Sequence, residues 1–320
     1  MVLALGAALA VSLIAAVPAV AVTAFTVSGT RVLHSPPYPE QLLPGYFTGN
    51  AVTHIDYPAA IFGMDASVGI AAAAIARAVP NTVGPLVVAG FSQGAIAVTY
   101  AMQAVMALPA DQRPAIDQLS FITIGDPTAT SGIMRFLPIA VPFIALTPVA
   151  MPDTPYDTVI VNGEYDGWGD FPDRPWNLLS VVNALLGTLY VHGHYEVIPG
   201  GLDLSTADVS TTVNSLGGKT TTYLLPTAKL PLVQPLRDIG IPEPLVAAIE
   251  APLRAIVDAG YARHDTTSAP LAVTASAEPV TTPVIKPLRT VRSAQVRGET
   301  PRARQATAPA SRHRGSAAAS

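Results

Sequence analysis

The segment Gly90-Phe91-Ser92-Gln93-Gly94 constrains the fold of this chain more than any other part of its sequence. It directly follows the apolar run Pro85–Ala89 (PLVVA) and opens a helical pattern over Gln93–Ala107. A serine in a tight turn between a buried strand and a helix is the arrangement of a nucleophile elbow. Glycine is expected on both sides because a Cβ there would clash within the turn. The motif therefore predicts an α/β protein that holds Ser92 at the mouth of a sheet.

Strands and helices alternate on both sides of this motif, from residue 22 to about residue 200. The other predicted elements are a helix over Asp65–Ala78 and strands over Val22–Val27, Thr53–Asp56, Leu119–Ile124 and Thr158–Val161. Such alternation indicates a mainly parallel sheet with helices on both faces. We therefore expect a three-layer sandwich of the α/β-hydrolase kind.

Two apolar stretches interrupt the alternation. Thr128–Pro155 contains the run Phe136–Ala150, which prolines break up and which is too apolar for a plain solvated loop. Leu224–Tyr261 contains an amphipathic helical pattern over Pro244–Ala259. Each stretch is compatible with a lid-like insertion or a lipid-facing wall, and each is equally compatible with ordinary packing.

The two ends of the chain differ from its body. Val2–Val17 is almost wholly apolar and uncharged, which is typical of an export signal or a membrane anchor. We favour an uncleaved anchor over residues 1–21; cleavage after Ala19-Val20-Ala21 and an N-terminal core helix are the alternatives. Residues 265–320 are rich in Ala, Ser, Thr, Pro and Arg and predict a disordered tail. The hydrolase domain is then expected over residues 22–264.

Charge is distributed unevenly along the chain. The formal net charge is −4; residues 265–320 hold eight Lys and Arg against three Asp and Glu, so the first 264 residues carry −9. An acidic body argues against nucleic-acid binding, because neutralising phosphates requires a basic surface. The chain has no cysteine, which excludes disulfides, thiolate metal sites and a cysteine nucleophile.

A serine nucleophile needs a base and an orienting acid, which follow it in the order Asp or Glu, then His, in this kind of fold. The loop after the last predicted strand offers Asp166, the preferred acid, and Asp170 as the alternative. Of the six histidines, only His192 and His194 lie downstream of this loop and inside the predicted body, which His264 ends. We predict His192 as the base, because the glycine after it frees the backbone, and keep His194 as the alternative.

The oxyanion formed in acyl transfer needs backbone donors. One is expected to be the N–H of Gln93, the residue after the nucleophile. The second is expected from the turn after the first strand, with Thr30 or Gly29 as donor; a plain glycine turn is the equal alternative there. The pair His192 and His194 is also a metal-binding pattern, but no further ligand cluster accompanies it, so we expect no metal and no cofactor.

These motifs together resemble the mycobacterial PE-PPE domain family, in order from about Val22 to His264. The matching stretches are Tyr57-Pro58-Ala59, Gly90–Gly94, Tyr165–Pro172, Pro175–Leu179, Tyr190–Tyr195 and Leu225–Leu232. In two respects the chain departs from the family. A short hydrophobic segment stands where a PE or PPE module is expected, and Asp126-Pro127 replaces the Asn-Pro of many members, near the mouth of the site.

The resemblance implies a cutinase-like fold, serine esterase activity on fatty-acyl esters and an actinobacterial cell-envelope setting. Carried over by motif, the catalytic residues are Ser92, His192 and one of Asp166 and Asp170. Some members of the family are acyltransferases that build acylated trehalose glycolipids.

The sequence therefore predicts an esterase or lipase acting on lipid or acyl-ester substrates at the cell envelope, held at the membrane by its N-terminal segment. An acyltransferase with the same catalytic residues is the alternative, because motifs do not report whether water is excluded and an acceptor positioned. An inactive hydrolase fold that binds envelope components is the second alternative. The motifs identify no protein partner.

Overall fold

The computed structural model describes residues 22–32, 35–197 and 200–265. The predicted anchor at residues 1–21 and the predicted tail from residue 266 onwards lie outside these ranges. Within them, none of the helices combines the length and the apolar character needed to cross a bilayer.

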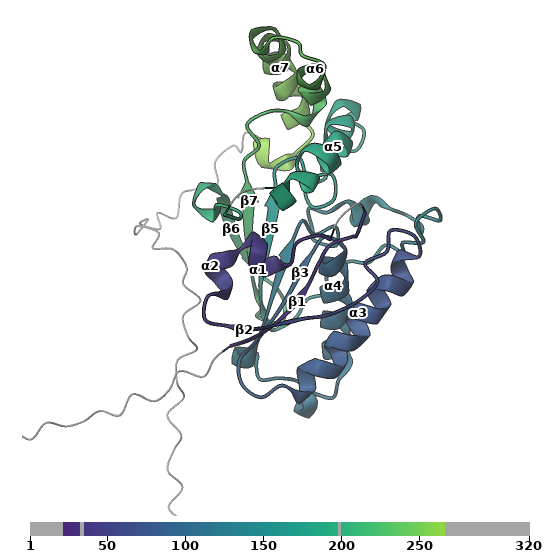
Figure 1. Cartoon of the computed structure of the whole chain (residues 1–320), viewed down its shortest axis with the longest axis vertical. Helices are drawn as coiled ribbons and strands as arrows, with labels where there is room; N and C mark the ends of the chain where they lie inside the picture. Colours follow the sequence, from purple (N-terminus) through teal and green to yellow (C-terminus); the bar gives the residue numbers. More distant parts are fainter. Residues whose placement is uncertain (1–21, 33–34, 198–199, 266–320) are drawn as a thin grey trace, which may run out of the picture. The chain divides into compact units, whose positions relative to one another are not determined.

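A seven-stranded sheet forms the centre of the described part (Figure 1). Its strands are β1 (Thr23–Val27), β2 (Ala51–His54), β3 (Leu86–Phe91), β4 (Leu119–Ile124), β5 (Asp157–Gly163), β6 (Asp208–Val213) and β7 (Lys219–Leu225). They lie in the order β2-β1-β3-β4-β5-β7-β6, and each neighbouring pair is parallel except β6 with β7. The prediction of an α/β protein with a mainly parallel sheet is confirmed.

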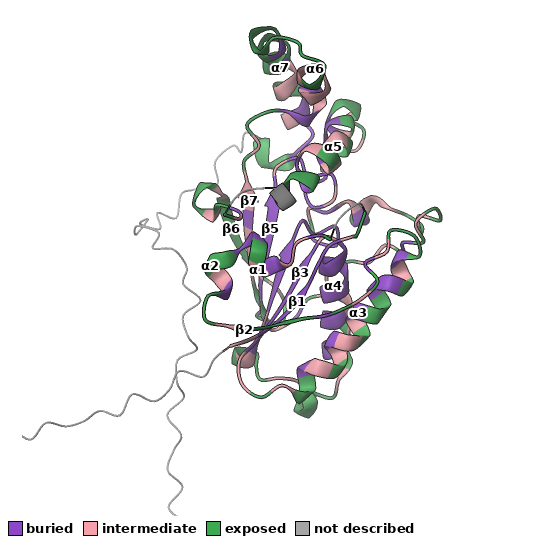
Figure 2. Cartoon of the chain, viewed as in Figure 1, coloured by how far each residue is buried: buried purple, intermediate pink, exposed green. Residues whose placement is uncertain are grey.

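Helices cover the two faces of the sheet unequally. The helices are α1 (Pro39–Leu42), α2 (Pro44–Phe47), α3 (Met64–Ala78), α4 (Gln93–Ala107), α5 (Leu178–Tyr190), α6 (Gln234–Asp238) and α7 (Glu243–Asp258). On one face α3 and α4 pack against β1, β3 and β4 in the larger core. On the other face the short α1 and α2 and the segment after α5 enclose a second core. Strand β3, inside the sheet, is buried along its whole length, as its apolar sequence predicts (Figure 2).

A third apolar cluster lies beyond the carboxyl ends of the strands and joins Tyr165 and the segment 230–233 to α6 and α7 (Figure 1). The predicted helix over Pro244–Ala259 is confirmed as α7, which starts one residue earlier and ends one residue earlier. The sequence analysis did not predict α5, β6 or β7. Residues after 200 therefore contribute two more strands to the sheet, β6 and β7, whereas the predicted alternation ended at about residue 200.

Helix α5 lies very close to the loop that follows β5. Its buried residues are Ser180, Asn183, Ala184 and Gly187, which are small or polar. A Cβ at Gly187 would overlap the carbonyl oxygen of Tyr165. Ser180 Oγ donates to the Val257 carbonyl at 2.7 Å, and Asn183 Oδ1 accepts from the Leu232 N–H at 2.9 Å. Several close contacts thus fix the position of α5.

The apolar run Phe136–Ala150 has no regular helix after residue 136 and is fastened to the first turn of α3. The Met64 N–H donates to the Ile144 carbonyl and the Asp65 N–H to the Ala145 carbonyl, both at 2.9 Å. The Asp65 carboxylate accepts from the N–H and the hydroxyl of Thr147 at 2.8 and 2.6 Å. This attachment makes the run a fixed wall beside the carboxyl end of β3.

Candidate active site

Ser92 occupies a strained turn between β3 and α4. Its φ of 54° and ψ of −115° lie in a region that side-chain-bearing residues rarely adopt. The flanking glycines make this turn possible, since a Cβ at Gly90 would overlap the Gly94 carbonyl and one at Gly94 would lie 2.5 Å from the Val27 carbonyl oxygen. The steric reason predicted for these glycines therefore holds in the structure.

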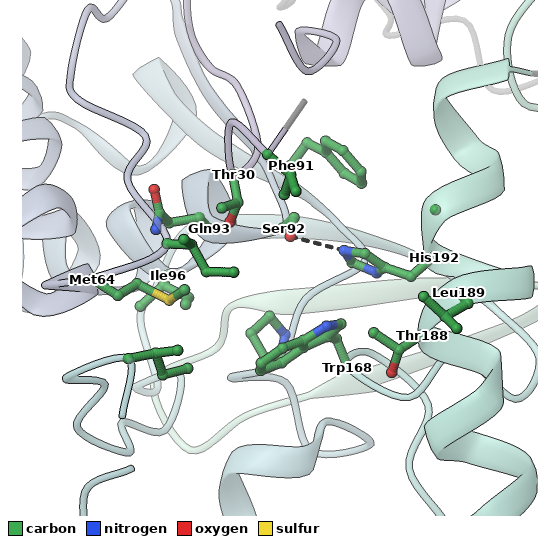
Figure 3. A pocket seen from close by; sticks show the side chains of 15 residues that line it. Thr30, Met64, Phe91, Ser92, Gln93, Ile96, Trp168, Thr188, Leu189 and His192 are labelled. Carbon is green, nitrogen blue, oxygen red and sulfur yellow. Dashed lines mark hydrogen bonds between the residues drawn. The ribbon is translucent and has the colours of Figure 1, made fainter. Parts of the chain in front are cut away.

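A chain of hydrogen bonds leads from Ser92 into the protein. Ser92 Oγ lies 2.8 Å from Nε2 of His192 (Figure 3), and Nδ1 of His192 lies 2.8 Å from Oδ2 of Asp166. Asp166 is fully buried and His192 is nearly so. Because an ionised carboxylate only accepts, His192 carries its proton on Nδ1, and Nε2 is then the acceptor for the Ser92 hydroxyl.

Two further donors bind the carboxylate of Asp166. The backbone N–H of Trp168 donates to Oδ1 at 2.8 Å, and the Tyr195 hydroxyl donates to Oδ2 at 3.0 Å. The Gly163 N–H in turn donates to the Tyr195 oxygen, which directs the phenolic hydrogen towards Asp166. Burial, followed by the nearby Asp166 charge, raises the pKa of Tyr195 well above its usual range, so the hydroxyl stays a donor.

The imidazole of His192 is held between an aromatic ring and a glycine. The Phe91 ring stacks on it with centroids 5.4 Å apart. A Cβ at Gly125 would lie 2.6 Å from Cε1 of His192, so the missing side chain leaves room for the ring. His192 begins a short 3₁₀ helix, His192–Val197, with one residue between it and the end of α5.

The alternative acid and base lie elsewhere. Asp170 is buried, pairs with Arg263 at 2.9 Å and accepts from the Tyr165 N–H at 2.8 Å. Burial is the main cause that raises the pKa of Asp170 to about 6. His194 is exposed, and its Nδ1 lies 3.3 Å from the Leu189 carbonyl. Across the described ranges, no three His, Asp or Glu side chains are grouped so as to hold a metal ion.

A cavity of about 480 Å³ opens beside Ser92 (Figure 3). Its lining consists of Thr30, Val32, Ile61, Met64, Phe91, Ser92, Gln93, Ile96, Pro127, Ile144, Trp168, Thr188, Leu189, His192 and Gly193. Of these described residues, none is Lys, Arg, Asp or Glu. The cavity therefore offers apolar walls and a few polar groups gathered at one place, which is typical of a small-molecule site.

Of the three residues expected as oxyanion donors, Gln93 and Thr30 line this cavity and Gly29 does not. Gln93 is the first residue of α4, so its N–H has no acceptor within the helix. Thr30 lines the same cavity, whereas Gly29 packs behind it, where a Cβ would lie 2.8 Å from the Phe91 ring. The Tyr57 hydroxyl donates to the Ser28 and Gly29 carbonyls at 2.7 and 3.2 Å and holds this turn in place.

Sequence reasoning missed Tyr195 and Asn162 as parts of the site. The Asn162 amide donates to the Gly169 carbonyl at 2.7 Å and accepts from the Asp126 N–H at 3.0 Å, so it ties the Asp166 loop to the end of β4. Asp126 is itself fully buried and accepts from the N–H and hydroxyl of Thr128, so its side chain does not face the cavity. Tyr195 lies in a motif that the family resemblance includes, but no rule of spacing gave it a role.

In a comparison with known families, residues 37–262 match the family described as the PE-PPE domain. Among curated proteins of Mycobacterium tuberculosis (strain ATCC 25618 / H37Rv), the chain is 44% identical to "Esterase PE16" over 186 residues, which is 56% of this chain and 34% of that protein. It is 39% identical to "Diacyltrehalose acyltransferase Chp2" over 198 residues, which is 59% of this chain and 54% of that protein. The chain thus spans about a third to a half of the length of these relatives.

Among solved structures, a cutinase-like protein from Cryptococcus sp. aligns with a TM-score of 0.31 and 17% identity. The alignment covers 47% of this chain and 79% of that one.

Proposed function

This chain belongs to the PE-PPE domain family, and we propose that it is a serine ester hydrolase with Ser92 as its nucleophile. The observation that carries the proposal is the hydrogen-bonded series from Ser92 through His192 to Asp166, with each contact at 2.8 Å and the serine opening into an apolar cavity. A serine hydroxyl reacts at neutral pH only when a base accepts its proton, and this series supplies the base and the acid that orients it.

The proposed reaction has two halves. Ser92 Oγ attacks the acyl carbonyl while Nε2 of His192 takes its proton, and the backbone N–H groups of Gln93 and Thr30 stabilise the oxyanion. The tetrahedral intermediate collapses, the alcohol leaves with the proton from His192, and the acyl group remains on Ser92. Water then gives a proton to Nε2 of His192 and attacks the acyl carbonyl; the second tetrahedral intermediate collapses, His192 returns the proton to Ser92 Oγ, and the acid is released. Asp166 stays ionised throughout and stabilises the imidazolium.

The substrate class we propose is a fatty-acyl ester. Aliphatic and aromatic side chains such as Ile96, Ile144 and Trp168 line the cavity, and its described lining has no side chain that would pair with a charged substrate. A hydrocarbon chain entering it leaves water at no electrostatic cost, since it needs no ionic partner. The name of one matched relative, an esterase, agrees with this class.

A second candidate is transfer of the acyl group to a sugar hydroxyl. It is favoured by the similarity to a relative named as a diacyltrehalose acyltransferase. The first half of the reaction is unchanged, and the sugar hydroxyl replaces water in the second. An inactive binding protein is the third candidate, which the close contact of Ser92 with His192 argues against.

Turnover of p-nitrophenyl esters from acetate to palmitate tests the proposal, with Ser92→Ala as the comparison. Hydrolysis that depends on Ser92 supports the proposed esterase activity, and the preferred acyl chain length indicates how long a chain the cavity holds. A burst of one equivalent followed by slow release, accelerated by trehalose, would instead support the transferase. If Ser92 did not react with a fluorophosphonate probe, the result would support the third candidate, an inactive binding protein.

A further inference from the structure

Helix α5 presents its large apolar side chains to water. Leu178, Val182, Leu185 and Leu189 are 72%, 44%, 53% and 66% exposed. Their spacing of four, three and four residues places them on one side of the helix. The buried side, described above, holds only small or polar residues. This is the reverse of an ordinary surface helix, whose apolar side faces the core.

The exposed side of α5, which we call the α5 face (Leu178, Val182, Leu185 and Leu189), runs directly into the cavity. Leu189 belongs to both, since it is largely exposed and also lines the cavity beside Ser92. Figure 3 shows Leu189 and Thr188 on α5 across the cavity from Met64 and Ile96. The α5 face is therefore continuous with the wall that a bound acyl chain would touch.

A second exposed apolar group borders the cavity at the loop before α3. Phe62 and Phe143 are 61% and 81% exposed and pack edge to face with centroids 5.5 Å apart. Ile139, on the same segment as Phe143, is exposed as well. We call Phe62 and Phe143 the Phe tip. Their neighbours Ile61 and Ile144 line the cavity, so the Phe tip adjoins its mouth as the α5 face does.

The segments that carry these two groups contain no charged residue. Ala59–Met64, Phe136–Ala150 and Pro175–Tyr190 lack Asp, Glu, Lys and Arg altogether. The chain as a whole has 12% charged residues, and an exposed, contiguous apolar surface marks a site of interaction. A partner that fits such a surface must be apolar and must require no ionic contacts.

We propose that the α5 face and the Phe tip dock on the surface of a lipid aggregate, so that acyl esters pass from the lipid into the cavity. This rests on the proposed function. A rigid protein or a second copy seated on both groups would cover the mouth between them, whereas a fluid lipid surface supplies substrate through it. Leucine and phenylalanine side chains gain favourable transfer free energy on entering hydrocarbon, and each contributes to binding.

The absence of cysteine allows a test at single positions of the full chain. Leu185→Cys and Phe143→Cys, each labelled with the environment-sensitive dye NBD, report on the two groups. Ile116→Cys is the control, because Ile116 is 65% exposed but precedes the start of β4, and β4 is parallel to β3, so Ile116 lies at the opposite end of the strands from Ser92. We expect phosphatidylcholine vesicles to shift the emission at positions 185 and 143 to the blue and to leave position 116 unchanged.

This readout is specific to the proposed surface whatever other part of the chain reaches the vesicle. If the protein binds vesicles in a flotation assay while the emission of the dye at positions 185 and 143 does not change, the proposal is wrong. A dye at 185 that is shielded without vesicles, in a protein that sediments as a dimer, would show that a second copy covers the α5 face and would equally overturn it.

Kinetics separate this proposal from the proposed function. Val182→Lys/Leu185→Lys alters two side chains of the α5 face that do not line the cavity. Because each exposed apolar side chain contributes roughly tenfold to partitioning, we expect turnover of a long-chain ester in vesicles to fall at least about tenfold. Turnover of soluble p-nitrophenyl acetate should stay within about twofold of wild type. Equal loss of turnover on both substrates would contradict the docking role. If the wild-type protein showed no Ser92-dependent turnover of the acetate while the dye still responded to vesicles, only the proposed function would be contradicted.

Discussion

Tyr195 and His192 hydrogen-bond to the same oxygen, Oδ2 of Asp166, at 3.0 and 2.8 Å. The imidazole thus shares its carboxylate partner with a buried hydroxyl whose own oxygen accepts from the Gly163 N–H. Removing this hydroxyl would take one hydrogen-bond donor from the Asp166 carboxylate and would let the carboxylate rotate more freely. We therefore assign Tyr195 a positioning role in the proposed reaction.

Tyr195→Phe tests this role. Because a hydrogen bond to a charged group contributes roughly 1.5–3 kcal/mol, we expect kcat to fall about tenfold or more, with KM little changed and the pH profile of kcat shifted. Tyr156→Phe is the matched control, since its buried hydroxyl donates to the Pro114 carbonyl at 2.9 Å, away from the serine. Equal kinetic effects in both variants would show that Tyr195 only stabilises the fold.

The strain at Ser92 predicts a difference between two inactive variants. Ser92→Ala and Ser92→Gly should both abolish turnover, because neither has a nucleophile. The φ of 54° with a ψ of −115° is adopted more easily by glycine. We expect Ser92→Gly to be the more stable of the two by about 1 kcal/mol in urea unfolding, although glycine has the higher entropy in the unfolded chain. A less stable glycine variant would contradict the strained geometry.

The two candidate acids should respond differently to amidation. Asp166→Asn leaves the imidazole with an amide partner that can favour the wrong tautomer, so we expect kcat to fall by about 10³–10⁴-fold. Asp170→Asn should keep kcat within about tenfold, because Asp170 faces Arg263 and the Tyr165 N–H. A larger loss in Asp170→Asn than in Asp166→Asn would reverse the assignment.

Asp170 also predicts how stability varies with pH. Burial raises its pKa from 3.8 in the unfolded chain to about 6 in the folded protein, so the folded state binds the proton more tightly. Its contribution to stability is present below pH 3.8 and is lost as the pH rises through about 6. We expect the free energy of unfolding of wild type, relative to Asp170→Asn, to fall by up to about 3 kcal/mol between pH 4 and pH 7. An increase over this range would show that the Arg263 charge outweighs burial.

Gly187 predicts the effect of adding one methyl group to α5. A Cβ there would overlap the Tyr165 carbonyl, one residue before Asp166. We expect Gly187→Ala to lower the free energy of unfolding by about 2 kcal/mol or more and to lower kcat as well. The same change at Gly69, an exposed position on α3 with no neighbour within 4 Å, should stabilise by up to about 1 kcal/mol. Calorimetry of both variants gives the comparison.

Much of the site followed from chain order. The run from a buried strand through Ser92 into a helix is local, and parallel strands bring their carboxyl ends to one edge, so a downstream acid and histidine were expected beside the serine. The sequence favoured Asp166 but left Asp170 open as the alternative, because the two glycines of this loop did not fix its path. That choice depends on Arg263, which lies more than ninety residues after either and pairs with Asp170.

The elements that were missed have physical reasons too. The run Leu178–Tyr190 has apolar residues at helical spacing, but they face outwards in α5, so the usual rule that the apolar side faces the core would have placed the wrong side of this helix in the core. Strand β6 is exposed at every position and rich in threonine, so it lacks the alternation of a half-buried strand. Its pairing with β7 is visible only in the assembled sheet.

The close packing of α5 also bears on the time course of catalysis. A helix whose Gly187 leaves no space against Tyr165, and whose Ser180 and Asn183 bond to neighbouring segments, cannot swing aside as a hinged cover would. The mouth beside Leu189 is accordingly open before any lipid is met. Product should then accumulate linearly from the moment of mixing with an ester-bearing surface, without the lag that a slow opening step would impose.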